Sequence, residues 1–105
     1  MIETSKINDI VNRIATRFNP DKIILFGSYA SGKANKGSDL DLLIIKDTDL
    51  PRLERTFDIR MSLRGSMIPM DILVYTAKEF EEEKNEKGSF LYSAIKTSKI
   101  LYERS

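Results

Sequence analysis

The chain has 105 residues and contains no His, no Cys and no Trp. The absence of imidazole and thiol groups excludes a Ser-His-Asp triad, a cysteine nucleophile and a zinc site built from Cys and His. With 17 Lys and Arg against 16 Asp and Glu, the formal net charge is +1, so no strong overall field attracts nucleic acid or an anionic membrane. Any catalysis must therefore rest on carboxylates, hydroxyls, Lys or Arg.

The first two predicted elements are a helix and a strand. Thr4 or Ser5 is the expected N-cap of the helix, and Asn19-Pro20 is expected to end it. Its apolar residues recur at helical intervals, at Ile7, Ile10, Val11, Ile14, Ala15 and Phe18. The run Ile23–Phe26 is short, apolar and mostly β-branched, and it stops at Gly27, which is typical of a buried strand.

The middle of the chain predicts two further strands joined by a helix. Residues 27–38 carry three glycines and are expected to be mostly loop, with a short helix over residues 29–31. Residues 40–45 and 70–75 are predicted strands. Between them, Leu53, Phe57 and Met61 lie four apart after Pro51, which predicts a crossover helix over residues 50–64.

The last third of the chain predicts two helices and an edge strand. Thr76 and Glu79 form a capping-box pattern that opens a charged helix over residues 77–86. A short helix around residues 90–95 and a strand over residues 99–103 follow. We therefore expect one domain, 1–105, of the α/β (α+β) class, without a membrane segment. Its small mixed sheet should have about three to five strands, with helices mainly on one face.

Three aspartates are the candidate catalytic and metal-binding residues. Asp39 and Asp41 stand two apart at the start of a strand, so their side chains project from the same face. Asp71 is the only charged residue of the third predicted strand. If these two strands are neighbours, the three carboxylates converge on one patch. Carboxylate oxygens suit Mg²⁺ or Mn²⁺, and two such ions support in-line displacement at a phosphorus atom.

Gly27 and Ser28 are the candidate phosphate-binding residues. A turn directly after a buried strand presents backbone N–H groups, which attract phosphate oxygens. The segment Gly27–Lys33 also matches the pattern G-x-x-x-x-G-K of a P-loop. However, Ala34 stands where a P-loop needs Ser or Thr, and a poor helix start follows, which argues against that motif.

Purely structural interpretations of the same residues stay open. Asp39 fits an exposed turn residue, because the sequence Gly-Ser-Asp is common in loops. Asp71 fits a strand-entry residue bonded to nearby backbone. Ser28 fits a helix cap, which is compatible with phosphate binding because both use the same N–H groups.

The motifs together resemble a known superfamily. Gly27-Ser28, followed by Ser38-Asp39-Leu40-Asp41 and an apolar strand, resembles the signature of the DNA polymerase β-like nucleotidyltransferases. The segments L-F-G-S-Y-A and M-D-I-L-V and the short chain resemble more specifically the minimal nucleotidyltransferases (MNT), antitoxins of MNT–HEPN toxin–antitoxin pairs. The resemblance extends over nearly the whole chain, including residues 88–92.

This resemblance implies a nucleotidyltransferase fold and a set of residue roles. Gly27, Ser28 and Ser38 would contact the nucleotide. Asp39, Asp41 and Asp71 would hold two Mg²⁺ ions, or Mn²⁺, and the third carboxylate would also help to deprotonate the acceptor. The implied reaction transfers AMP from ATP to a tyrosine of a HEPN toxin and releases pyrophosphate. Many family members carry Arg where this chain has Ser31.

The alternative is a non-catalytic antitoxin that neutralises its partner by occlusion. In either role we expect a cytoplasmic protein. No basic stripe with interleaved aromatic residues indicates a nucleic-acid acceptor. Larger relatives close the nucleotide cleft with a second domain. Since 105 residues leave no length for one, we expect a second protomer or the partner to complete the site.

Overall fold

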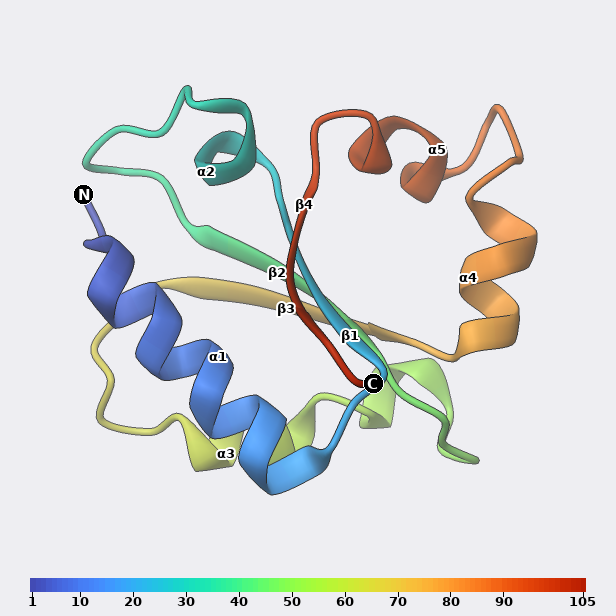
Figure 1. Cartoon of the computed structure of the whole chain (residues 1–105), viewed down its shortest axis with the longest axis horizontal. Helices are drawn as coiled ribbons and strands as arrows, with labels where there is room; N and C mark the ends of the chain where they lie inside the picture. Colours follow the sequence, from blue (N-terminus) through green and yellow to red (C-terminus); the bar gives the residue numbers. More distant parts are fainter.

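A four-stranded mixed sheet organises the computed structural model, which describes all residues, 1–105 (Figure 1). The strand order is β3-β2-β1-β4, with β1 antiparallel to β2 and to β4, and β2 parallel to β3. In chain order the elements are α1 (Thr4–Phe18), β1 (Lys22–Phe26), α2 (Ser28–Ser31), β2 (Leu40–Ile45), the 3₁₀ turn η1 (Arg52–Glu54), α3 (Phe57–Ser62), β3 (Met70–Tyr75), α4 (Ala77–Glu83), α5 (Phe90–Ile95) and β4 (Lys99–Glu103). The predicted fold class, strands and edge strand are confirmed.

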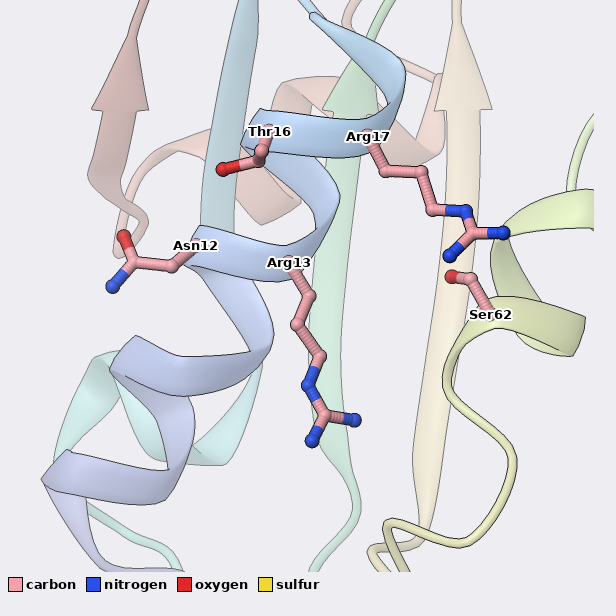
Figure 2. A pocket seen from close by; sticks show the side chains of 5 residues that line it. All are labelled: Asn12, Arg13, Thr16, Arg17 and Ser62. Carbon is pink, nitrogen blue, oxygen red and sulfur yellow. The ribbon is translucent and has the colours of Figure 1, made fainter.

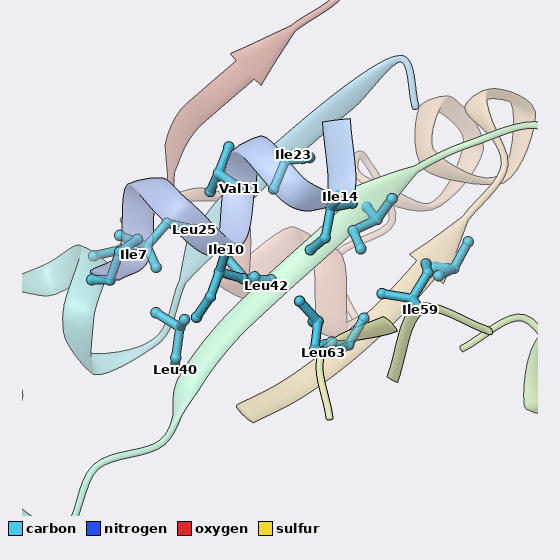
Figure 3. Close-up of a cluster of buried hydrophobic side chains, with 14 residues drawn as sticks. Ile7, Ile10, Val11, Ile14, Ile23, Leu25, Leu40, Leu42, Ile59 and Leu63 are labelled. Atoms are coloured by element: carbon cyan, nitrogen blue, oxygen red, sulfur yellow. The ribbon is translucent and has the colours of Figure 1, made fainter. Parts of the chain in front are cut away.

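Side chains of successive strand residues alternate between two buried layers. On one face, Leu40, Leu42 and Ile44 of β2 pack with α1 and α3, as Figure 3 shows for the first two of these residues. On the other face, Leu43 and Ile45 pack with residues of α4 and α5. The expectation of helices mainly on one face is therefore wrong, because both faces of β2 are apolar and each needs a cover.

The helix α1 buries the predicted face but begins earlier than expected. Four of its apolar residues are buried, at Ile7, Ile10, Val11 and Ile14. Glu3 is the N-cap and makes no side-chain cap hydrogen bond, so Thr4 and Ser5 lie within the helix and not at its cap. Asn19 ends the helix in the left-handed conformation, with φ of 48°, and Pro20 follows, as predicted.

The predicted crossover helix over residues 50–64 is two shorter pieces, η1 and α3, and it buries a different face. Leu53, Phe57 and Met61 are 96%, 65% and 43% exposed. Ile59 and Leu63 are buried at 2% and 3% exposure. Both sets share a four-residue spacing, so periodicity alone cannot choose between them, and the break after η1 lets α3 turn its other side inward.

The C-terminal third follows the prediction closely. Thr76 and Glu79 make both hydrogen bonds of a capping box at the start of α4. The helix ends at Glu83, three residues short of the predicted end at residue 86. No helix of the structure combines the length and the apolar character needed to cross a membrane.

Candidate active site

Asp41 and Asp71 lie side by side on neighbouring parallel strands. The two residues are register partners in the pairing of β2 with β3. Since Leu40 and Leu42 face α1, the alternation of side chains directs Asp41 to the opposite face, and Asp71 shares it. The parallel arrangement thus places two carboxylates at adjacent positions at the start of both strands.

Asp39 comes one residue before β2 and is exposed. A tight loop directly before it positions this residue. Ser38 Oγ accepts a hydrogen bond of 3.0 Å from the backbone N–H of Asn35, and Asn35 Oδ1 accepts one of 2.9 Å from the N–H of Gly37. The hydroxyl of Ser38, a predicted nucleotide contact, is therefore engaged in shaping the loop that leads to Asp39.

The three carboxylates interact electrostatically around Asp41. Burial raises the pKa of Asp41 above its usual value, and the nearby charges of Asp71 and then Asp39 raise it further. The two neighbouring negative charges disfavour ionisation of Asp41, and a bound cation would remove this conflict. The patch is therefore a region of concentrated negative charge suited to a cation.

Gly27 lies directly against Asp41. A Cβ atom at this position would lie 2.1 Å from Asp41 Oδ2, and the backbone φ of 72° is one that residues with side chains rarely adopt. Register pairing of Phe26 with Asp41 brings the end of β1 to this point. The glycine of the Gly-Ser pair is thus required by the position of a carboxylate.

Ser28 opens the short helix α2 immediately beyond this contact. The first N–H groups of a helix have no partner within it, so they remain available to an anion. Ser31, at the position where the family resemblance leads us to expect Arg, donates a hydrogen bond of 3.3 Å from its hydroxyl to the carbonyl of Ser28. This side chain therefore contributes no positive charge beside the turn.

An arginine that the sequence analysis missed contacts the third aspartate. Arg60 of α3 forms an ion pair with Asp71, with 3.8 Å between Arg60 Nη2 and Asp71 Oδ1. The contact depends on where α3 lies against the edge strand β3, and no local motif encodes that placement. Both side chains are about half exposed, so the pair contributes little stability.

A cleft of about 630 Å³ opens beside the paired aspartates, within the range of small-molecule sites. The elements that meet here are the C-terminal end of β1, the starts of β2 and β3, and α5, which lies at the same end of the sheet as α2 (Figure 1). The lining residues are Phe26, Gly27, Asp41, Asp71, Leu73, Phe90, Ser93, Ala94 and Thr97. The cleft thus combines an acidic end with an apolar wall.

The donor set fits a hard divalent cation, although the side chains do not yet surround one point. No three carboxylates lie close enough together to form a ready metal-binding cluster. The backbone nevertheless pairs Asp41 with Asp71, and Asp39 lies near enough to raise the pKa of Asp41. The side chains of Asp39 and Asp71 are exposed. Their oxygens are the ligands that Mg²⁺ and Mn²⁺ prefer.

A second hollow, of about 620 Å³, lies between α1 and α3, on the opposite face of the sheet (Figure 2). It is lined by Asn12, Arg13, Thr16, Arg17 and Ser62. Arg17 extends from α1 toward Ser62 of α3 (Figure 2). This hollow contains no carboxylate, so it lacks the groups for metal-assisted chemistry and is not the candidate active site.

A family model matches nearly the whole chain. Residues 8–105 match the family model described as polymerase beta, nucleotidyltransferase. The chain belongs to this nucleotidyltransferase family. The match includes every predicted site residue and nearly the whole chain, so the superfamily expected from the Gly-Ser and Ser-Asp-x-Asp motifs is confirmed.

One curated protein and one solved structure are similar to this nucleotidyltransferase. A Methanocaldococcus jannaschii protein named "putative protein adenylyltransferase" is 31% identical over 106 residues, which cover 97% of this chain and all of that protein. The crystal structure of a "putative nucleotidyltransferase" from Sulfolobus solfataricus matches with a TM-score of 0.67 and 20% identity. That match covers 95% of this chain and 79% of the other, and supports the fold. The family match and the named relative together support transferase activity of the nucleotidyltransferase type.

Proposed function

We propose that this nucleotidyltransferase transfers AMP from ATP to a hydroxyl acceptor with release of pyrophosphate. The observation that carries the proposal is the register pairing of Asp41 with Asp71 beside the turn at Gly27 and Ser28. Acidic oxygens for cations lie at one end of the cleft beside Gly27, and the next residue, Ser28, opens α2, whose first backbone N–H groups suit phosphates. The name of the Methanocaldococcus relative supports adenylyl as the group transferred.

In this proposal each site residue has a defined role. Asp39, Asp41 and Asp71 hold two Mg²⁺ ions, and Mn²⁺ can replace them. These ions, when bound, neutralise charge on the phosphates and stabilise the leaving pyrophosphate. The N–H groups at the start of α2 orient the phosphates, while Ser38 keeps the loop before Asp39 in place.

The reaction needs no covalent enzyme intermediate. The acceptor oxygen forms a bond to the α-phosphorus as the bond from that phosphorus to the bridging oxygen of pyrophosphate breaks. Asp71 is more exposed than its register partner Asp41, and it accepts the proton of the acceptor hydroxyl. In the absence of His and Cys, direct attack by the acceptor is the simplest route through this site.

We propose a tyrosine of a HEPN-domain toxin as the acceptor, so that the chain acts as an antitoxin by modifying its partner. The support is the resemblance of the whole chain to minimal nucleotidyltransferases. The competing function is neutralisation by occlusion alone. It draws support from Ser31, whose side chain supplies no cation for the triphosphate.

The test is transfer of label from α-labelled ATP, in the presence of Mg²⁺, to the proposed HEPN-domain partner. We expect label on a tyrosine of that protein. Asp41→Asn should lower the transfer at least about 100-fold, the scale of losing a group that acts in the transition state. Asp47→Asn is the matched control, because Asp47 is exposed and lies outside the cleft.

The same variants separate the two functions. If Asp41→Asn stops labelling and also abolishes neutralisation of the partner, the chain is an enzymatic antitoxin. If the partner is never labelled and Asp41→Asn neutralises it as well as wild type does, the enzymatic proposal fails and occlusion takes its place. Omission of the divalent cation should stop labelling in the wild type, and labelling in its absence would contradict the metal roles.

A further inference from the structure

Phe90 is a large aromatic side chain left half exposed inside the cleft. It is the first residue of α5, its exposure is 49%, and it lines the same cleft as Asp41 and Asp71. The other exposed large hydrophobic residues of the chain lie outside this cleft. Aromatic side chains with a few polar groups beside them are typical linings of small-molecule binding sites.

The ring of Phe90 is held in place from behind. It contacts Phe26 in an edge-to-face arrangement, with 5.4 Å between the ring centroids and 81° between the ring planes. Ser89 fixes the start of α5, because its Oγ accepts a hydrogen bond of 3.2 Å from the N–H of Tyr92 and donates one of 2.6 Å to the carbonyl of Glu83. A ring fixed in this way loses little conformational entropy when a ligand binds to it.

The surroundings of Phe90 fit a flat, aromatic ligand. Leu73 and Ala94 add apolar surface to the cleft wall, while the hydroxyls of Ser93 and Thr97 supply polar groups that can bond to the edge of a ring. No Lys or Arg lines the cleft, so this wall attracts an uncharged group. In the proposed function, the phosphates lie at the acidic end, where the carboxylates would hold cations.

We propose that Phe90 is the platform on which an aromatic ring of a substrate stacks during nucleotidyl transfer. This proposal rests on the proposed function and extends it to a substrate-binding residue. The shared chemistry is a planar ring within reach of the carboxylates. Two substrates contain such a ring. They are the nucleobase of the triphosphate and the phenol of an acceptor tyrosine, and the experiment distinguishes between them.

The first arm measures the Kd of the purified chain for ATP and for tripolyphosphate, which has no base, in Mg²⁺ by calorimetry. If the base stacks on Phe90, Phe90→Ala and Phe90→Leu should weaken ATP binding about 5- to 100-fold, leave tripolyphosphate binding unchanged, and be rescued by Phe90→Tyr. Phe90→Leu retains apolar packing on Phe26, which separates loss of stacking from loss of folding. The control is Ile100→Ala, because Ile100 is exposed on β4 outside the cleft.

The second arm measures the KM for a short tyrosine-containing peptide as acceptor at saturating ATP. If the acceptor ring stacks on Phe90, both variants should raise this KM while the Kd for ATP stays at the wild-type value. If neither quantity changes in Phe90→Ala or Phe90→Leu, the platform proposal is overturned and the proposed function stands. If wild type binds neither ATP nor tripolyphosphate, both proposals fail.

Discussion

Gly27 shows at the scale of one residue how the fold and the candidate site depend on each other. Its backbone has φ of 72°, and Asp41 Oδ2 occupies the space that a side chain at this position would need. The pair Gly27-Ser28 thus has two physical tasks. Glycine admits a carboxylate against the backbone, and the next residue opens a helix with free N–H groups.

The substitution Gly27→Ala should therefore harm both stability and activity. We expect at least about 2–3 kcal/mol lower free energy of unfolding, because strained backbone and a close contact add together. Displacement of Asp41 should also lower nucleotidyl transfer. Urea unfolding and the labelling assay measure the two effects.

Two other glycines serve as matched controls for this prediction. Gly32 has φ of 81° but open space around it, so Gly32→Ala tests backbone strain without the contact and should be milder. Gly88 has neither feature, and Gly88→Ala should be close to neutral. Equal losses in all three variants would show that the contact with Asp41 is unimportant.

Part of the site follows from local sequence, and part of it does not. The sequence indicates through strand alternation that Asp39 and Asp41 share one face, whereas the pairing of Asp41 with Asp71 on neighbouring strands is established only by the structure. Their catalytic roles remain predictions. Arg60 and Phe90 contact or line the site only because α3 and α5 pack where they do. Such contacts depend on tertiary placement, which no short motif records.

Element α3 shows the corresponding limit at the scale of a helix. Two apolar pairs with four-residue spacing, Phe57 with Met61 and Ile59 with Leu63, offer two possible buried faces. The structure buries the second pair. Arg55, which donates hydrogen bonds to the carbonyls of Leu50 and Val74, fixes the approach of the chain to this helix. The helix α1 has only one apolar face, so its buried side is predicted correctly from the sequence.

This pattern of burial predicts a large loss of stability at Ile59 and little change at Phe57, two nearby residues of α3. Ile59→Ala should lower the free energy of unfolding by about 2–5 kcal/mol, because it leaves a cavity in the core beneath α1. Phe57→Ser should change it by no more than about 0.5 kcal/mol, because the ring is 65% exposed. Urea denaturation of both variants measures these values. A larger loss for Phe57→Ser than for Ile59→Ala would favour the face indicated by the Leu53, Phe57 and Met61 spacing.

At the scale of the whole molecule, one ion-pair network joins the two helical layers around the edge of the sheet. Arg55, between η1 and α3, contacts both carboxylate oxygens of Glu79 in α4, at 2.6 and 3.2 Å. Arg52 adds contacts to Glu79 at 3.3 Å and to Glu83 at 2.9 Å. The side chain of Arg55 is only 9% exposed, so this pair is shielded from solvent better than the surface pairs elsewhere.

The network predicts a specific dependence of stability on pH. The hydrogen bond from Arg55, with further contributions from the N–H of Thr76 and the charge of Arg52, lowers the pKa of Glu79 from 4.5 to about 2. Because the pKa is lower in the folded chain, the stabilisation is fully present above about pH 4.5 and is lost as the pH falls toward about 2. Glu79→Gln, which cannot ionise, should be less stable than wild type by about 1–3 kcal/mol at pH 7.

The difference between wild type and Glu79→Gln should shrink steadily between pH 4.5 and pH 2, where wild type also loses the charge. Denaturant unfolding at a series of pH values measures this difference and cancels the titration of the other carboxylates. Glu82→Gln is the matched control, because Glu82 lies on the exposed side of the same helix and forms no ion pair. The free energy of unfolding of Glu82→Gln should therefore stay close to that of wild type at every pH. If the difference in free energy of unfolding between wild type and Glu79→Gln does not change with pH, packing of the Glu79 side chain, and not its charge, joins α4 to the segment of η1 and α3.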